Sequence, residues 1–381
     1  MNIFSDPAWQ LVPFHFWTAV FFIFGSMVGS LLNVCIHRMP RGESVVWPPS
    51  HCPHCNYKIP GYLNIPIVTW IVLRGKCANC KAPISPRYLL VELLTGLLFV
   101  AAWLRVGEQS TALAIAYCVI LSGFVVATFI DFEHFIIPDE ITIGGIFAGL
   151  LASAAAPLLH MTDSRATAMF RSFVGILIGG GVIYLILRGG KLLFGRYQIA
   201  LPEPAPVTFT EDAVLLPEER VPYEDVFYRK SDSIVFDATK LELVDRCFTN
   251  VRVKLSPEEL LIGEEKFNPE EVRFMEATTA LLSMPREAMG FGDVKFMAAI
   301  GAFLGWQATF FSLMVSSALG LVITGIATLA RGKEWSSRIP YGPYIAGAAV
   351  IWMFAPEWVR VETIRNLDLL KAIITGKAFP G

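Results

Sequence analysis

Long apolar runs constrain this chain more than any other feature. Eight stretches of the 381 residues approach the roughly 20 apolar residues that a helix needs to cross a bilayer. Hydrophobic residues make up 54% of the chain and charged residues only 17%, which is typical of a membrane protein and not of a soluble enzyme. Because lipid cannot satisfy free backbone groups, and the alternation of a barrel strand is missing, these runs predict helices. The expected spans are 14–35, 88–106, 112–130, 141–159, 170–193, 293–306, 308–330 and 341–356.

Two long polar loops interrupt the apolar pattern. The loop 36–87 is rich in Cys, Pro and Gly, and the loop 194–286 carries more acidic than basic residues. The second loop contains short β-branched runs, such as Ser233–Phe236 and Val251–Leu255, that are typical of strands. The sequence therefore predicts an all-α polytopic membrane protein with about eight transmembrane helices, a four-cysteine loop and a small β-rich soluble insertion.

The expected domain organisation follows from these runs and loops. Residues 1–35 contain the first transmembrane helix, and residues 36–87 form the four-cysteine domain. Helices two to five occupy 88–193, the acidic insertion occupies 194–286, helices six to eight occupy 287–356, and 357–381 is a C-terminal tail.

Basic residues predict the orientation of the chain in the membrane. The loop 36–87 is the richest in them, with Arg38, Arg41, Lys58, Arg74, Lys76, Lys81 and Arg87. The positive-inside rule therefore places this loop in the cytoplasm and the N-terminus outside. The net charge of −2 gives no reason to expect a nucleic-acid partner. We expect a multi-pass membrane protein, with lipid as its immediate surroundings.

Four of the seven cysteines form two C-x-x-C pairs in this loop, Cys52 with Cys55 and Cys77 with Cys80. Such paired knuckles are typical of a tetrahedral thiolate site, and Zn²⁺ suits four thiolates in a reducing compartment. Two disulfides or four free thiols are the alternatives. The pattern predicts a structural zinc site made by these four cysteines.

Two aspartates lie at the predicted membrane boundaries. Asp131 ends the third span, and Asp293 opens the sixth directly after Gly290-Phe291-Gly292. A carboxylate beside hydrocarbon is costly and is usually functional or paired. Two carboxyls that share one proton can activate water and polarise a peptide carbonyl, as aspartic peptidases do. Asp131 and Asp293 are therefore the candidate catalytic pair.

Two neighbouring charged residues have simpler interpretations. Asp139 follows Pro138 just before the fourth span, where an aspartate is most often a helix N-cap. Lys295 could form a salt bridge, but we favour a lysine that extends toward the membrane surface near a helix start.

The two aspartate segments resemble the type IV prepilin peptidases. Asp131 with Ile137-Pro138-Asp139 downstream matches the first aspartate motif of that family, and Gly290-Phe291-Gly292-Asp293 matches its G-x-G-D motif. The resemblance extends to the N-terminal region, through Gly29–Pro40, Cys52–Cys55, Asn64–Pro66, Gly75–Cys80, Ile84–Tyr88 and Glu92.

The resemblance implies a membrane aspartic endopeptidase of the bacterial inner membrane that removes the leader peptide of prepilins or pseudopilins at the cytoplasmic face. It also implies N-methylation of the new N-terminus with S-adenosylmethionine. No G-x-G-x-x-G loop precedes a predicted helix, so the methyl donor rests on the resemblance alone, and its binding residues stay unassigned.

Two alternatives remain open at this point. One is another G-x-G-D membrane peptidase, although the cysteine loop argues against it. The other is a transporter whose carboxylates bind protons or cations, which predicts acidic residues deep within the spans and repeated halves. The sequence indicates neither an oligomeric state nor a particular pilin client.

Overall fold

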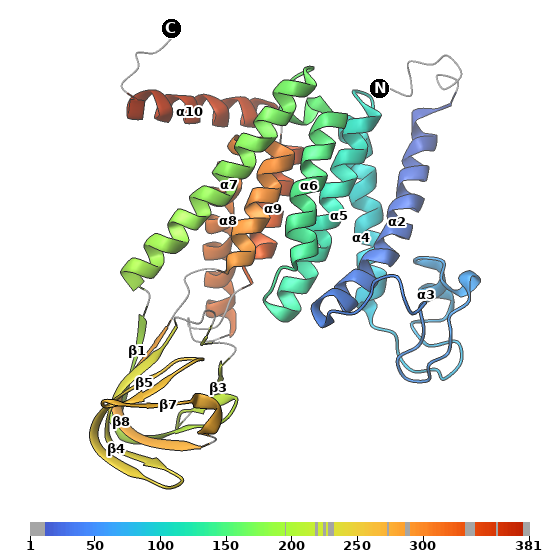
Figure 1. The fold of residues 1–381 in the computed structure, drawn as a ribbon. Helices are drawn as coiled ribbons and strands as arrows, with labels where there is room; N and C mark the ends of the chain where they lie inside the picture. Colours follow the sequence, from blue (N-terminus) through green and yellow to red (C-terminus); the bar gives the residue numbers. More distant parts are fainter. Residues whose placement is uncertain are drawn as a thin grey trace. The chain divides into compact units, whose positions relative to one another are not determined.

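The computed structural model describes residues 12–194, 196–217, 220–223, 226–227, 232–272, 274–285, 290–331, 340–355 and 357–375. The chain divides into two compact units. The first comprises Met1–Tyr184 and Gly290–Gly381 and is helical, whereas the second comprises Leu185–Met289 and is built around a β-sheet (Figure 1).

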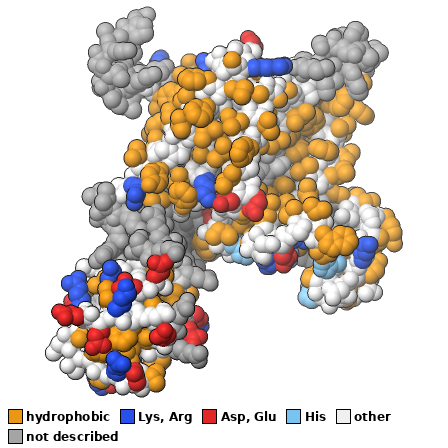
Figure 2. All heavy atoms as spheres, viewed as in Figure 1, with side chains coloured by type: hydrophobic (Ala, Val, Ile, Leu, Met, Phe, Trp, Pro, Cys, Tyr) orange, Lys and Arg blue, Asp and Glu red, His pale blue; other side chains and the backbone are white. Residues whose placement is uncertain are grey.

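Long apolar helices dominate the first unit, and its visible face is largely hydrophobic (Figure 2). Within the described ranges, five helices are long and apolar enough to cross a membrane: α2, α4, α5, α7 and α8. The helices of four turns or more are α2 (Phe14–Arg38), α4 (Pro86–Val106), α5 (Thr111–His134), α6 (Asp139–Ala155), α7 (Arg165–Phe194), α8 (Phe291–Arg331) and α10 (Glu357–Thr375). The shorter α9 spans Gly342–Phe354.

The expected sixth and seventh spans belong to one helix, α8, which is interrupted at Gly305. Gly305 has φ 81° and ψ 172°, a backbone conformation that strongly favours glycine. The expected fourth and eighth spans correspond to α6 and α9, with 17 and 13 residues. At 1.5 Å per residue α9 measures about 20 Å, less than the roughly 30 Å of a hydrocarbon core. The count of eight spans therefore stays a prediction.

Glycines bring the first part of α8 into close contact with two other helices. A Cβ added at Gly175 of α7 would lie 2.0 Å from the carbonyl oxygen of Gly301, and one at Gly179 would lie 2.5 Å from that of Met297. On α6, a Cβ at Gly149 would lie 2.6 Å from Ala302. Gly175 and Gly179 are four residues apart, as in the small-residue motifs through which membrane helices pack closely.

The interruption at Gly305 leaves backbone carbonyls of α8 that side-chain hydroxyl groups satisfy. The Ala302 carbonyl accepts hydrogen bonds from Ser172 Oγ of α7 at 2.7 Å and from Ser153 Oγ of α6 at 3.2 Å. Thr309 Oγ1 donates to the Gly305 carbonyl at 3.1 Å. Broken helices are tolerated in membranes where neighbouring side chains restore such bonds, so these hydroxyls support the break.

The second unit contains an eight-stranded antiparallel sheet in the order β3-β2-β1-β8-β4-β5-β6-β7. The expected strand segments lie in β4 (Ile234–Leu243) and β5 (Cys247–Leu255), whose alternating buried residues face an apolar core. The other strands are β1 (Arg196–Phe209), β2 (Ala213–Leu215), β3 (Arg220–Pro222), β6 (Leu260–Ile262), β7 (Glu265–Phe267) and β8 (Met275–Pro285).

The two ends of the sheet unit pair with each other. Arg196, at the start of β1, is paired with Pro285, at the end of β8. The chain therefore enters and leaves the sheet at neighbouring points, which allows it to be inserted between α7 and α8. Three prolines, Pro202, Pro204 and Pro206, lie within β1, where the register with β8 shifts between Ala200 and Ala205. Proline has no N–H to donate to the ladder, which explains the irregular pairing there.

The contact between α7 and α8 generates a prediction about stability. Gly175→Ala would force a methyl group against the Gly301 backbone and should cost about 1–3 kcal/mol of stability or more through overpacking. Gly181→Ala is the matched control, because a Cβ there meets nothing within 4 Å. We expect the apparent Tm in detergent to fall for Gly175→Ala only. Equal Tm values for the two variants would contradict the close packing.

Candidate active site and metal cluster

Asp131 lies in the last turns of α5 and is directed at the start of α9. Its side chain is only 5% exposed, and its Oδ2 accepts a hydrogen bond from the backbone N–H of Gly342 at 2.8 Å. Gly342 is the first residue of α9, where free N–H groups and the helix dipole favour a carboxylate. A Cβ at Gly342 would lie 2.9 Å from this oxygen, so glycine gives Asp131 the room it needs.

Asp293 lies in the first turn of α8 and is 9% exposed. Its carboxyl group is near enough to that of Asp131 for the two to interact electrostatically. Ile137 lies beside Gly292, the residue before Asp293, and beside Gly342, the residue that bonds to Asp131. A Cβ added at Gly292 would contact Ile137 at 3.5 Å, and one at Gly342 would contact it at 3.1 Å. The structure therefore brings together the two aspartates that the sequence singles out.

Asp139 and Lys295 differ from their expected roles. Asp139 is the first residue of α6, Pro138 occupies the N-cap position, and no side chain caps this helix. Instead Asp139 Oδ1 pairs with Lys295 Nζ at 2.5 Å. The expectation of an N-cap at Asp139 is therefore wrong, and for Lys295 the salt bridge that the sequence left open is the contact observed. The ion pair joins the starts of α6 and α8 beside Asp293.

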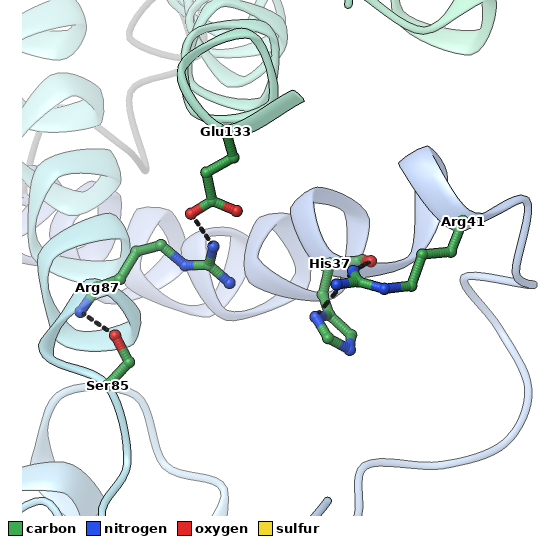
Figure 3. A network of polar contacts seen from close by, with 5 residues as sticks. All are labelled: His37, Arg41, Ser85, Arg87 and Glu133. Atoms are coloured by element: carbon green, nitrogen blue, oxygen red, sulfur yellow. Dashed lines mark hydrogen bonds and ion pairs between the residues drawn. The ribbon is translucent and has the colours of Figure 1, made fainter. Parts of the chain in front are cut away.

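At the same end of the helical unit, polar contacts join α4 to α5 and tie the last turn of α2 to the residues that follow it (Figure 3). Arg87, in the first turn of α4, pairs with Glu133, in the last turn of α5, and Ser85 Oγ caps α4 by accepting the N–H of Arg87. Arg41 Nη1 lies 3.2 Å from His37 Nδ1 at the end of α2. The loop that carries the cysteines therefore leaves the helices at the end where Asp131 lies.

Two buried polar residues hold the base of the cysteine loop. Asn33 Nδ2 of α2 donates to the carbonyl of Tyr88 in α4 at 3.0 Å, which joins the helices on either side of the loop. Glu92 Oε2 of α4 accepts the N–H of Ile67, within the loop, at 2.7 Å. Ile67 has a φ of 64° and precedes the short helix α3 (Val68–Val72). Glu92 thus stabilises a strained turn, which gives it a structural role.

Cys52, Cys55, Cys77 and Cys80 form one cluster whose sulfur atoms all lie within 4.8 Å of one another. The two C-x-x-C turns are alike. In each, the first cysteine's N–H bonds to a carbonyl five residues on, and the residue after the second cysteine, Asn56 or Lys81, has a positive φ. Cys52 Sγ and Cys80 Sγ are 3.8 Å apart, about the separation expected for thiolates 2.3 Å from a shared tetrahedral ion.

The electrostatics of the cluster favour a bound cation. Backbone N–H groups of Cys80 and Asn79 lower the pKa of the Cys77 thiol to about 6, so that it is a thiolate at neutral pH. The N–H of Ala82 lowers the pKa of Cys80, but burial and the neighbouring thiols outweigh it and raise that pKa to about 11. Four thiolates this close together repel one another, so a bound cation would stabilise them. All seven cysteines are free of disulfides, and these four could hold a metal ion.

Sequence reasoning missed one residue of the site, Gly342. Its signal is Gly342-Pro343 directly before an apolar run, because proline is favoured in the first turn of a helix. Nothing in the sequence indicates that this particular helix start faces Asp131, which lies 211 positions earlier.

Comparison with known families and proteins addresses the identity of the chain. Residues 23–106 match the bacterial Peptidase A24 N-terminal domain, and residues 273–325 match the type IV leader peptidase family. The prepilin leader peptidase/N-methyltransferase of Aeromonas hydrophila is 28% identical over 369 residues, which cover 90% of this chain and 92% of that protein.

Two other relatives are more similar over shorter aligned regions. The prepilin leader peptidase/N-methyltransferase of Dichelobacter nodosus is 34% identical over 207 residues, covering 46% of this chain and 68% of that protein. The type 4 prepilin-like proteins leader peptide-processing enzyme of Escherichia coli is 36% identical over 190 residues, covering 45% and 70%. The chain belongs to the type IV prepilin peptidase family. No solved structure matches it.

The family membership agrees with the site. The first matched region of this prepilin peptidase family member contains the four-cysteine cluster, and the second contains Asp293. Asp131 lies between the two regions, in α5. The sheet unit lies mainly between them as well, which agrees with an insertion into a helical family core.

Proposed function

We propose that this protein cleaves the leader peptide from type IV prepilins or pseudopilins and that Asp131 and Asp293 are its catalytic pair. The observation that carries the proposal is that two buried carboxyl groups lie at one end of the helical unit, Asp131 against the start of α9 and Asp293 in the first turn of α8, in a chain of this family. A proton- or cation-coupled transporter and another G-x-G-D peptidase are not favoured, because the homologous proteins are named as prepilin-processing enzymes.

The hydrogen bonding supports a division of roles between the two aspartates. The N–H of Gly342 favours the ionised form of Asp131, because a donor stabilises a carboxylate more than a carboxylic acid. Asp131 then takes a proton from the attacking water, while protonated Asp293 donates to the carbonyl oxygen of the scissile peptide. When the tetrahedral intermediate collapses, the proton on Asp131 passes to the leaving amine and Asp293 recovers its own.

The active site faces the cytoplasm in this proposal. The loop between α2 and α4 is rich in basic residues, which the positive-inside rule places in the cytoplasm, and a four-cysteine metal site suits a reducing compartment. Arg87 and Glu133 connect the base of that loop to the helix of Asp131. The family membership and the five apolar helices support a location in a bacterial inner membrane, surrounded by lipid.

The metal of the four-cysteine cluster is Zn²⁺ in this proposal. Four cysteine thiolates at tetrahedral separation make a closed structural site, with no position left for substrate or water. Zinc would hold the two C-x-x-C turns together and so fix the loop whose backbone Glu92 contacts.

The second proposed activity is N-methylation of the new N-terminus with S-adenosylmethionine, which the names of two of these relatives support. We assign no residue to the methyl donor, since the sequence lacks a G-x-G-x-x-G loop before a helix. With purified protein, a prepilin and the donor, mass spectrometry should find a pilin that has lost its leader and gained one methyl group. A shortened product without the methyl group would contradict the second activity alone.

Replacing either aspartate tests the catalytic pair. Asp131→Asn and Asp293→Asn should each reduce the cleavage rate by about 10³-fold or more, because neither amide can exchange the required proton. Asp139→Asn is the matched control, since Asp139 pairs with Lys295 outside the proposed pair. Leader removal is followed on gels in detergent, with size-exclusion profiles as a check on folding. Substantial cleavage by a folded Asp131 or Asp293 variant would refute the assignment.

Gly342→Ala tests whether the start of α9 positions Asp131. The added methyl group would lie 2.9 Å from Asp131 Oδ2 and should displace the carboxylate. We expect kcat to fall by about 10²-fold, because small displacements of a catalytic group are costly, with KM nearly unchanged. Gly347→Ala, in the same helix and in open space, should behave as the parent. An unchanged kcat for Gly342→Ala would mean that this contact does not position Asp131.

Metal analysis tests the cluster. The parent should contain about one zinc ion per chain, and Cys77→Ser should lose most of it, because three thiolates hold Zn²⁺ less tightly than four. Cys247→Ser is the control, since Cys247 is exposed and lies in β5, outside the cluster. Elemental mass spectrometry of the purified proteins gives the content. Zinc retained in Cys77→Ser, or a parent that binds none, would contradict the site.

A further inference from the structure

An apolar groove of about 230 Å³ lies in the helical unit between α2, α5, α6 and α8. It is distinct from the aspartate pair, since neither Asp131 nor Asp293 lines it. Leu32 of α2, Phe124 of α5 and Ile141 of α6 contribute apolar walls, and Phe296 of α8 packs edge-on against Phe124 with ring centroids 5.7 Å apart. The volume suits the side chains along one face of a helix.

The groove starts beside the proposed catalytic pair and runs away from it. On α8 its lining extends from Phe296, one turn after Asp293, to Phe303. On α6 it extends from Glu140, next to Asp139, to Ala148. Both stretches correspond to about 10–12 Å along a helix axis, or two turns. The groove therefore continues from the aspartates into the depth of the helical unit.

Two glycines that line the groove face open space, whereas other glycines of this protein lie in close contact with a neighbouring helix. Gly123 of α5 and Gly144 of α6 both line the groove, and a Cβ on either would meet nothing within 4 Å. At Gly175, by contrast, a Cβ would lie 2.0 Å from the backbone of α8. The helices that border the groove are thus not packed against each other at Gly123 and Gly144.

Glu140 places a negative charge at one end of the groove. Of the described residues that line it, only Glu140 is charged, and within the part of the chain that the structure describes it forms no ion pair. Glu140 lies in the first turn of α6, at the end of the groove nearest the aspartates. Its carboxylate complements the positive N-terminal end of a helix. It would also attract the ammonium group that peptide hydrolysis creates at the new N-terminus.

We propose that this groove binds the apolar helix that follows the scissile bond of the substrate, with the N-terminus of that helix at Glu140. The inference rests on the proposed function. A peptide bond that reaches Asp131 and Asp293 lies at the ends of membrane helices, so a chain that continues from it into the bilayer must be helical. The groove gives that helix an apolar, open surface beginning one turn from Asp293.

Filling the groove tests the proposal. Gly144→Leu and Gly123→Leu place side chains in its open space, and Gly181→Leu is the matched control, in open space on α7 outside the groove. Each variant is assayed on a full precursor and on a short soluble peptide that contains the scissile bond but ends before the apolar helix. The ratio of kcat/KM for precursor to that for peptide should fall about tenfold or more in the groove variants, as expected for losing the burial of one or two apolar side chains. Gly181→Leu should keep the parent ratio.

A second measurement removes any dependence on peptide turnover. A photo-reactive benzophenone side chain is placed in the second turn after the scissile bond of the precursor, and the precursor is irradiated with the Asp131→Asn protein. Adducts should map to the groove-lining parts of α5 and α6 and should decrease when Gly144→Leu is added. An unchanged kinetic ratio, or adducts confined to other helices, would overturn the proposal and would indicate that lipid occupies the groove. A failure of the aspartate assignment is recognised separately, because Asp131→Asn would then still cleave both substrates.

Discussion

The close contact of α8 with the glycine faces of α6 and α7 is the constraint on which the helical unit depends. The first part of α8 carries Asp293, and its backbone approaches Gly149, Gly175 and Gly179 too closely for any side chain there. Lipid offers little hydrophobic drive for helices to associate, so such tight van der Waals packing holds them together. The contacts of the α8 backbone with α6 and α7 therefore set the position of Asp293 at the start of α8.

The break at Gly305 and the bond from Gly342 extend this constraint to the whole site. The break separates the tightly packed first part of α8 from the remainder, and Ser153 and Ser172 satisfy the carbonyl of Ala302 near it. The start of α9 meets Asp131 at the other end of the unit. In the proposed mechanism, these contacts hold two carboxyls from separate helices close together, although like charges would otherwise drive them apart.

Much of this arrangement follows from the sequence because its signals are local. The apolar runs, the two C-x-x-C pairs and the glycines before Asp293 each show in a few consecutive residues. The remaining features depend on contacts between distant segments. Asp139 would be a helix cap in isolation, and only the fold brings Lys295 to it. The apolar pattern does not predict the helix α10, because Glu357–Thr375 carries too many charged residues to form an apolar run. The proposed catalytic roles, the span count and the orientation stay predictions.

The central claim is that Asp131 and Asp293 act together on one peptide bond. An experimental structure with a peptide analogue, in which a hydroxyl-bearing carbon replaces the scissile carbonyl, tests it most directly. The account predicts that this hydroxyl lies within hydrogen-bond distance, about 2.5–3.2 Å, of both carboxyl groups. A hydroxyl that contacts only one aspartate, or neither, would contradict the account.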